Sequence, residues 1–167
     1  KQSVITRAVT KGIRPDRPMK NSGIDWIGYI PDNWTVLRKL SYAVNKSISY
    51  GIVKLFDPDD EKGVKVLRCS DVKEGRIDTT NIRTVTQEVS KEYGRTVLDG
   101  GEVLINVRGT LGGCAVVPPE MKGYNIAREV AMVSLSERIL NRYLMYYFLS
   151  RVFVTYEERH LAGSVYI

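Results

Sequence analysis

The sequence of 167 residues has few of the side chains that build metal sites and disulfides. It contains two cysteines, Cys69 and Cys114, and one histidine, His160. Neither cysteine has a neighbour at metal-ligand spacing and each lies in an apolar context, so both are expected to be reduced core residues. A histidine-based metal site or a Ser-His-Asp triad would depend on His160 alone. We therefore predict neither, and interpret His160 as a surface residue near the end of a helix.

Long apolar runs are also missing. No stretch approaches the length needed to cross a bilayer, and residues 1–17 are too polar for a signal peptide. These absences predict a cytoplasmic protein without a membrane partner. Hydrophobic residues make up 43% of the chain, which is enough for a sizeable core in one domain.

Positive charge is concentrated at the N-terminal end. The chain has 25 basic and 19 acidic residues, a formal net charge of +6. Residues 1–20 contain six of the basic residues and one of the acidic ones, or +5. The remaining 19 basic and 18 acidic residues give residues 21–167 a charge of +1. A DNA-binding surface in this part would have to come from the arrangement of its charges, because there is almost no excess.

Two catalytic patterns are approached but incomplete. Asp59 and Asp71, with Lys73, imitate the carboxylates and lysine of metal-dependent nucleases, but Asp59 lies in a strongly charged loop and Asp71 follows its predicted strand. No glycine-rich turn follows a first strand, as a methyltransferase would need, and residues 109–113 lack the spacing and the following lysine of a phosphate-binding loop. We predict no catalytic residue and no metal site.

A predicted β-hairpin at residues 100–118 is the centre of the chain. Val103, Ile105 and Val107 alternate with other residues as in a strand, and the apolar pattern resumes after a glycine-rich turn that begins at Arg108. The three glycines of this turn are explained by chain reversal alone. The tip is nevertheless polar and basic, so it is also a candidate for binding.

The other elements indicate an α+β domain, with a twisted, mostly antiparallel or mixed sheet and flanking helices. Its apolar stretches predict strands at 64–69 and 130–135, a short helix at 90–93, and a long final helix that Ser136 begins and that continues to Val152.

Residues 2–11 predict a helix that precedes this domain. Its apolar stripe is too short to support itself, so we expect it to pack against a second helix of the parent protein or a neighbouring molecule. The predicted partner-binding residues are Val4, Ile5, Ala8 and Val9. A linker rich in proline and basic residues follows, which divides the chain into a helical stub at 1–18 and a domain at 19–167.

Six motifs follow one another along the chain. They are Pro31-Asp32-Asn33-Trp34, VLRCSDVKEGRID at 66–78, GGEVLINVRGTLGG at 100–113, YNIAREVAMV at 124–133, RYLMYYFLS at 142–150 and AGSVYI at 162–167. Each is weak alone, but their order is specific. Together they resemble the target recognition domain of a type I restriction-modification specificity subunit.

The opening segment also resembles the end of the central helical spacer of these subunits. This likeness implies the C-terminal recognition domain, whereas residues 19–23 also resemble the start of an N-terminal one, so both positions stay open. The loop after Tyr50 departs from the family pattern, which leaves its contacts undefined.

The resemblance implies a non-catalytic protein that binds one half of a bipartite target in double-stranded DNA. Its partners would be methyltransferase subunits and, through the complex, restriction subunits. S-adenosylmethionine, ATP and magnesium would be used by those subunits, and this chain would bind no cofactor. The alternatives are a protein-interaction module that does not bind DNA and, less favoured, a divergent metal-dependent nuclease.

The expected DNA contacts are arginines near strand ends and the short polar residues beside them, because both can bind base edges and phosphates. Arg108 is the best single candidate, and for Arg68 and Arg128 the alternative is an ion pair with Asp71 or Glu129 inside the scaffold. The predicted set is Arg68, Ser70, Arg83, Arg108, Thr110, Asn125 and Arg128, with a second contact loop at Lys46, Ser49, Tyr50 and Lys54.

Overall fold

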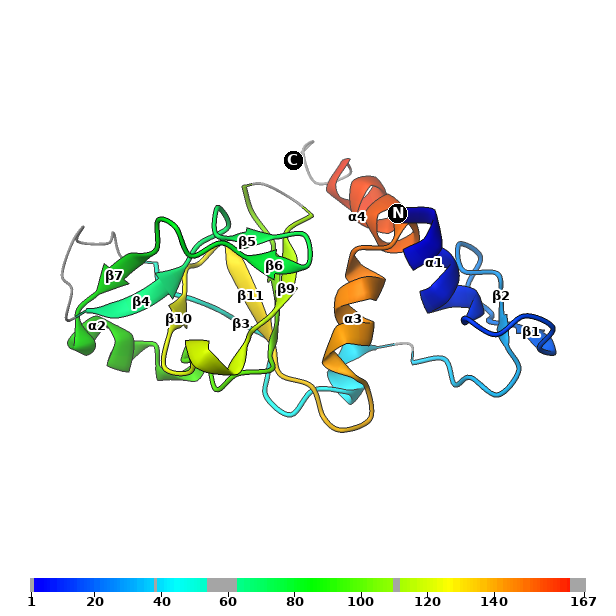
Figure 1. Ribbon diagram of the computed structural model, residues 1–167, viewed down its shortest axis with the longest axis horizontal. Coiled ribbons are helices and arrows are strands. Elements are labelled where there is room, and N and C mark those ends of the chain that lie inside the picture. Colours follow the sequence, from blue (N-terminus) through cyan, green and yellow to red (C-terminus); the bar gives the residue numbers. More distant parts are fainter. Residues whose placement is uncertain (1, 38, 54–62, 110–111, 163–167) are drawn as a thin grey trace. The chain divides into compact units, whose positions relative to one another are not determined.

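The computed structural model describes residues 2–37, 39–53, 63–109 and 112–162, and only the backbone of residues 160–162. The chain forms two compact units: residues 1–40 with 146–167, and residues 41–145. Helices and antiparallel or mixed sheets both occur (Figure 1), so the predicted α+β class is confirmed. The C-terminal helix packs with the N-terminal segment and therefore belongs to the first unit. The expected division into a helical stub at 1–18 and a domain at 19–167 stays a prediction.

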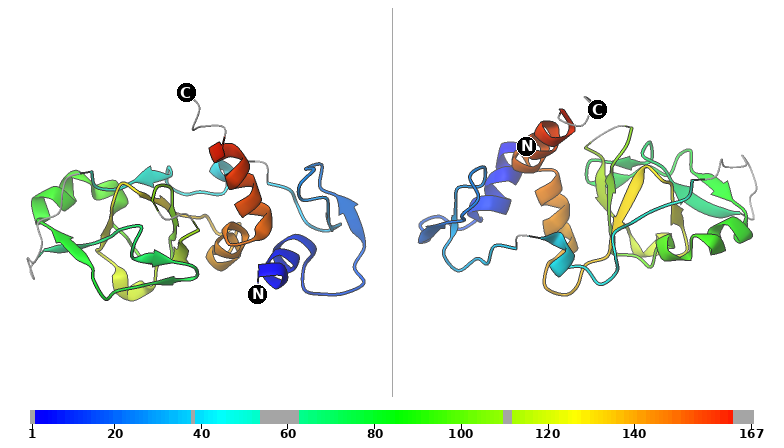
Figure 2. Two further views of the ribbon diagram at one scale, coloured as in Figure 1. Left: turned by 90° about the horizontal axis from the view of Figure 1, so that it is seen from above. Right: turned by 180° about the vertical axis from the view of Figure 1, so that it is seen from behind.

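The smaller unit is built on two helices that lie side by side (Figure 2). These are α1 (Gln2–Lys11) and α4 (Arg151–Ala162). The backbone N–H of Arg151 donates to Oγ1 of Thr6 at 2.9 Å, which caps the start of α4. A two-stranded antiparallel ribbon of β1 (Met19–Asn21) and β2 (Tyr29–Pro31) completes the unit, with β2 against α1.

The predicted first helix is confirmed, but much of its apolar stripe is covered within the same chain. Val9 is only 6% exposed, and Ile5 and Ala8 are half-buried, because α4 and β2 pack against α1. Val4 is 70% exposed. The expected external partner is therefore not needed for Val9, and only the start of the stripe faces solvent.

The larger unit contains two principal sheets and a small hairpin. The four-stranded sheet has the order β3-β11-β8-β9 and is antiparallel throughout, and the three-stranded sheet has the order β10-β4-β7 with β10 parallel to β4. The strands are β3 (Ser49–Tyr50), β4 (Val64–Leu67), β5 (Val72–Lys73), β6 (Arg76–Ile77), β7 (Arg83–Val85), β8 (Val103–Asn106), β9 (Cys114–Val116), β10 (Asn125–Ile126) and β11 (Val130–Val133).

Short helical segments connect these strands. They are α2 (Gln87–Glu92), which Thr86 caps, and the 3-10 turns η1 (Leu40–Tyr42), η2 (Gly94–Thr96) and η3 (Pro119–Met121). In the part of the chain that is described, no helix is long and apolar enough to cross a membrane.

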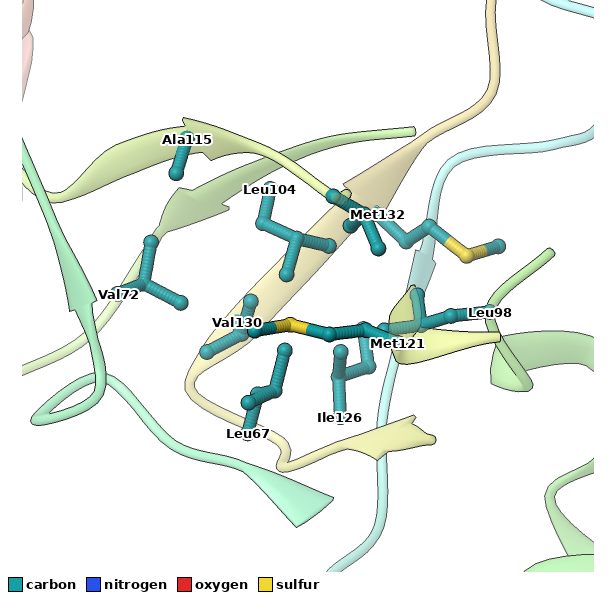
Figure 3. Close-up of a cluster of buried hydrophobic side chains, with 10 residues drawn as sticks. Leu67, Val72, Leu98, Leu104, Ala115, Met121, Ile126, Val130 and Met132 are labelled. Atoms are coloured by element: carbon teal, nitrogen blue, oxygen red, sulfur yellow. The ribbon is translucent and has the colours of Figure 1, made fainter. Parts of the chain in front are cut away.

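The predicted central hairpin is β8 paired with β9, and its core strand is buried on both faces. Leu104 belongs to the main hydrophobic cluster, which gathers side chains from several strands of both sheets (Figure 3). Val103, on the other face, is also fully buried. The sequence predicted a strand with a single apolar face, but a central strand covered on both sides needs apolar residues in succession.

The predicted final helix is two helices. Residues 136–140 form a turn, and α3 (Asn141–Phe148) begins five residues after Ser136, whose backbone N–H instead donates to the Ala43 carbonyl at 2.8 Å. Ser150 breaks the helix, because its Oγ donates to the Tyr147 carbonyl at 2.6 Å and accepts from the Phe153 N–H at 3.4 Å. The side chain that interrupts one helix thus starts the next.

Candidate nucleic-acid interface

All four arginines of the predicted set lie at the same end of the two sheets. Arg68 follows β4, and Arg128 comes two residues after β10, which runs parallel to β4. Arg83 begins β7 opposite Val66, at the same end of β4. Arg108 comes two residues after β8. We call these four residues the arginine end.

Backbone hydrogen bonds join the two sheets at this end. The Ala127 N–H donates to the Leu67 carbonyl at 2.9 Å, and the Val107 N–H donates to the Glu129 carbonyl at 2.9 Å. The segment 127–129 therefore lies between the turn after β4 and the loop after β8. In Figure 1 the connections from β4 to β5 and from β10 to β11 lie along the upper side of the larger unit.

Three members of the arginine end face solvent. Arg83, Arg108 and Arg128 are all exposed. Among the described residues no ion pair holds any of them, including the considered pair between Arg128 and Glu129. Three guanidinium groups from separate segments are thus available to an external anion or hydrogen-bond acceptor.

Arg68 is held inside the scaffold. Its Nε and Nη2 donate to the Asp71 carboxylate at 3.1 and 3.0 Å, and Nη2 also donates to the Asn81 carbonyl at 2.7 Å. Ser70 donates through Oγ to the same carboxylate at 3.0 Å. The bonds of Nε and Nη2 favour for Arg68 the scaffold role that was the alternative to DNA contact. Ser70, which was expected to contact DNA, uses its hydroxyl on the same carboxylate.

Asn125 is part of the interior and not of the surface. Its side chain is fully buried, its Oδ1 accepts from Thr96 Oγ1 at 2.7 Å, and its Nδ2 donates to Ser90 Oγ at 3.3 Å. This position corrects the expectation that Asn125 contacts DNA, since a buried amide with its own partners cannot reach a ligand.

The predicted second contact loop is not one loop. Lys46 lies near the end of β11 opposite to the arginine end, and its Nζ pairs with Asp99 at 2.9 Å. Ser49 and Tyr50 form the edge strand β3 alongside β11, with Tyr50 61% exposed. The position of Lys46 at the opposite end of the sheet corrects the expectation that it joins the other contacts. Lys54, like Thr110 in the hairpin tip, is outside the described residues.

Comparisons with known proteins agree with the resemblance that the sequence motifs indicated. No family model matches the chain. It is 26% identical over 156 residues, 90% of its length, to the type I restriction enzyme EcoBI specificity subunit of Escherichia coli. This chain resembles type I restriction enzyme specificity subunits. A second similar protein is the MjaVIII specificity subunit of Methanocaldococcus jannaschii, at 25% identity over 98% of the chain.

The chain spans about a third of the length of the specificity subunits that it matches, 32% and 38% for the two relatives. Solved structures give the same result for the fold. The HsdS subunit of Thermoanaerobacter tengcongensis superposes on 89% of the chain with a TM-score of 0.57 at 18% identity. A second solved structure, from work on complex assembly of the type I R-M system, superposes on 87% of the chain with a TM-score of 0.55 at 19% identity.

Two further cationic side chains lie near the arginine end and were not predicted from the sequence. Lys73 and Arg76 flank the turn of the β5–β6 hairpin, and the Gly75 N–H donates to the Cys114 carbonyl at 2.8 Å. Cys114 is the first residue of β9 and pairs with Ile105 near the end of β8. The signal in the sequence was a cation on each side of the Glu-Gly turn, between two apolar residues.

The nuclease-like pattern has a structural explanation at one of its two acids. Asp71 is almost fully buried and its carboxylate is bonded to Arg68 and Ser70. Asp59 lies outside the described residues. Across the described ranges, no three His, Cys, Asp or Glu side chains gather as a metal site would require.

Proposed function

We propose that this chain is the target recognition domain of a type I specificity subunit and binds one half of a bipartite sequence in double-stranded DNA. The observation that carries the proposal is the arginine end: four separate segments bring Arg68, Arg83, Arg108 and Arg128 to one end of the sheets, and three of the guanidinium groups are exposed. The similarity to two specificity subunits over at least 90% of the chain supports it.

The chemistry of these side chains suits DNA. A guanidinium group donates two parallel hydrogen bonds to O6 and N7 of guanine in the major groove, or to phosphate oxygens. Residues 21–167 are nearly neutral, so this local clustering supplies the attraction that their net charge does not.

The chain is a non-catalytic part of its complex in this proposal. Methyltransferase subunits would assemble with the specificity subunit, and restriction subunits would join through that complex. The recognition domain would span residues 19–167, and residues 1–18 would be the end of a helical spacer. The cofactors of modification and cleavage would belong to the other subunits.

The test uses the complete specificity subunit assembled with its methyltransferase subunits. Methylome sequencing of cells that carry the system would give the bipartite target. Binding to a duplex with that target is then measured by fluorescence anisotropy over a range of salt concentrations, for the wild type, Arg108→Ala, Arg128→Ala and the control Arg95→Ala. Arg95 is an exposed arginine in η2, which follows α2 and the far end of β7.

We expect the logarithm of the binding constant to fall linearly with the logarithm of the salt concentration. Arg108→Ala should weaken binding by about 1–3 kcal/mol if Arg108 contacts a base, or lower the salt slope by about one if it contacts phosphate. Arg95→Ala should bind as the wild type does. A wild-type complex that binds the methylated target no better than random duplex would overturn the proposal.

A further inference from the structure

Two like charges lie directly opposite each other in the β5–β6 hairpin. The register pairs Lys73 with Arg76 and Val72 with Ile77. Val72 is buried in the main cluster and Ile77 packs against it. Because neighbouring residues of a strand point to opposite faces, Lys73 and Arg76 share the outer face. Opposed like charges destabilise an antiparallel pair, so the hairpin carries a cost that its own fold does not require.

The surrounding residues compensate this charge only weakly. Among the ion pairs of the described residues, the hairpin cations have only that of Arg76 with Asp78, whose Oδ2 lies 3.9 Å from Nη1 of Arg76. The other oxygen of Asp78 accepts from the backbone N–H and Oγ1 of Thr80, at 3.1 and 2.6 Å. The Arg76 side chain is 68% exposed, and an exposed pair at this distance contributes little. The outer face is therefore suited to an anionic ligand that can neutralise both cations.

The hairpin is also fixed in place. At its base the Asp78 N–H donates to the Asp71 carbonyl at 2.8 Å, and Asp71 is held by Arg68. At its tip the Gly75 N–H donates to Cys114, with φ of +76° at Gly75 allowing a two-residue turn. Nothing lies within 4 Å of where a Gly75 side chain would begin. The hairpin is thus held against β9, with Gly75 and Arg76 exposed and Lys73 half-buried.

We propose that the β5–β6 hairpin is a second DNA-contacting element at the arginine end, with Arg76 on a base edge and Lys73 on a phosphate. This inference rests on the proposed function and adds residues that determine specificity. The major groove admits a two-stranded ribbon, a guanidinium group matches guanine, and an ammonium group is a point charge suited to phosphate. A phosphate backbone supplies the anion that the opposed cations lack.

The test uses the same assembled complex with the variants Lys73→Ala, Arg76→Ala and Arg76→Lys, and with Arg95→Ala as the control. Binding is measured for the methylome target and for duplexes that differ from it at one base pair. Arg76→Ala should lower affinity for the target about 5- to 150-fold and remove discrimination at one base pair. Arg76→Lys should keep the salt slope but lose that discrimination.

Lys73→Ala should weaken all duplexes evenly and lower the salt slope by about one. The melting temperatures of Lys73→Ala and Arg76→Ala should not fall, because each removes a like-charge repulsion, so lost binding would not reflect lost folding.

Two results separate this inference from the function on which it rests. If the wild type binds its target and Arg108→Ala weakens it, while the hairpin variants bind as Arg95→Ala does, this inference alone is wrong. If the wild type shows no preference for its target, the proposed function and this inference both fail. If Arg76→Ala weakens binding to all duplexes by the same factor, Arg76 does not contact a base.

Discussion

The guanidinium group of Arg68 and the carboxylate of Asp71 form a two-point ion pair, with Nε to Oδ2 at 3.1 Å and Nη2 to Oδ1 at 3.0 Å. Asp71 Oδ2 also accepts from the backbone N–H of Arg68 at 2.8 Å. The Asp71 side chain is 5% exposed and that of Arg68 is 23% exposed. One carboxylate therefore closes the turn after β4 and fixes the start of the β5–β6 hairpin.

Asp71→Ala should lower the free energy of unfolding by about 3 kcal/mol, because it leaves a partly buried guanidinium and a backbone N–H without their acceptor. Urea unfolding followed by circular dichroism measures this. Asp99→Ala is the matched control, since it removes the carboxylate of the exposed pair with Lys46, and it should cost less than about 1 kcal/mol. Equal losses for both variants would contradict a special role for the Arg68–Asp71 pair.

Asn125→Ala should act on stability and not on the proposed DNA interface. The substitution removes a buried amide that accepts from Thr96 Oγ1 at 2.7 Å and donates to Ser90 Oγ at 3.3 Å, which should cost about 1–3 kcal/mol of unfolding free energy. At a temperature where the variant is folded, its affinity for duplex and its salt slope should equal those of the wild type. A changed salt slope with unchanged stability would show that Asn125 contacts DNA.

Gly51→Ala should be strongly destabilising because β3 continues into a segment that touches β10. A Cβ at position 51 would overlap the backbone carbonyl of Ile126, the same carbonyl that accepts from the Ile52 N–H at 2.8 Å. We expect a loss of about 2 kcal/mol or more, since backbone must move. Gly94→Ala is the control, because nothing lies within 4 Å of a Cβ at that position. Its free energy of unfolding, measured by thermal unfolding, should lie within about 1 kcal/mol of the wild-type value. Equal melting temperatures for the two variants would contradict the close approach.

Glu157→Gln should stabilise the protein at neutral pH. Burial, and secondarily the charge of Glu158, raises the pKa of Glu157 above its ordinary value of 4.5. A carboxyl group whose pKa is raised by folding favours the folded state fully below its unfolded pKa, and this contribution is lost as pH rises through the folded pKa. At pH 7 the wild type therefore carries the cost of a partly buried charge that the amide avoids.

The gain from Glu157→Gln should be a few tenths of a kcal/mol, because the residue is only half-buried. Melting temperatures at pH 7 and pH 4 measure it, and the difference from the wild type should shrink at pH 4. Glu158→Gln, at an exposed position, should give a smaller gain by removing only the repulsion. A gain from Glu157→Gln that is equal at both pH values would show that the charge of Glu157 is not its cause.

Short-range patterns in the sequence were enough to predict the helices and strands that depend on neighbouring residues. The alternation around Val103 and Ile105 predicted the strand β8 and its hairpin, and the stripe at 2–11 predicted α1 up to Lys11. The ordered motifs also predicted the family resemblance. These inferences succeeded because periodicity and turn residues act over a few neighbouring positions. The same patterns missed the break at Ser150, where a side chain competes with the helix for backbone hydrogen bonds.

Only the tertiary structure decided which polar residues face solvent. Arg68 and Arg128 have similar surroundings in the sequence, each close to an acid, yet Arg68 is bonded to Asp71 and Arg128 is exposed without a bond to Glu129 among the described ion pairs. Lys46 and Asn125 were expected at the interface and lie elsewhere. Strand register and the partners of buried groups depend on residues far apart in the chain, so the gathering of the arginine end follows from packing and not from local sequence.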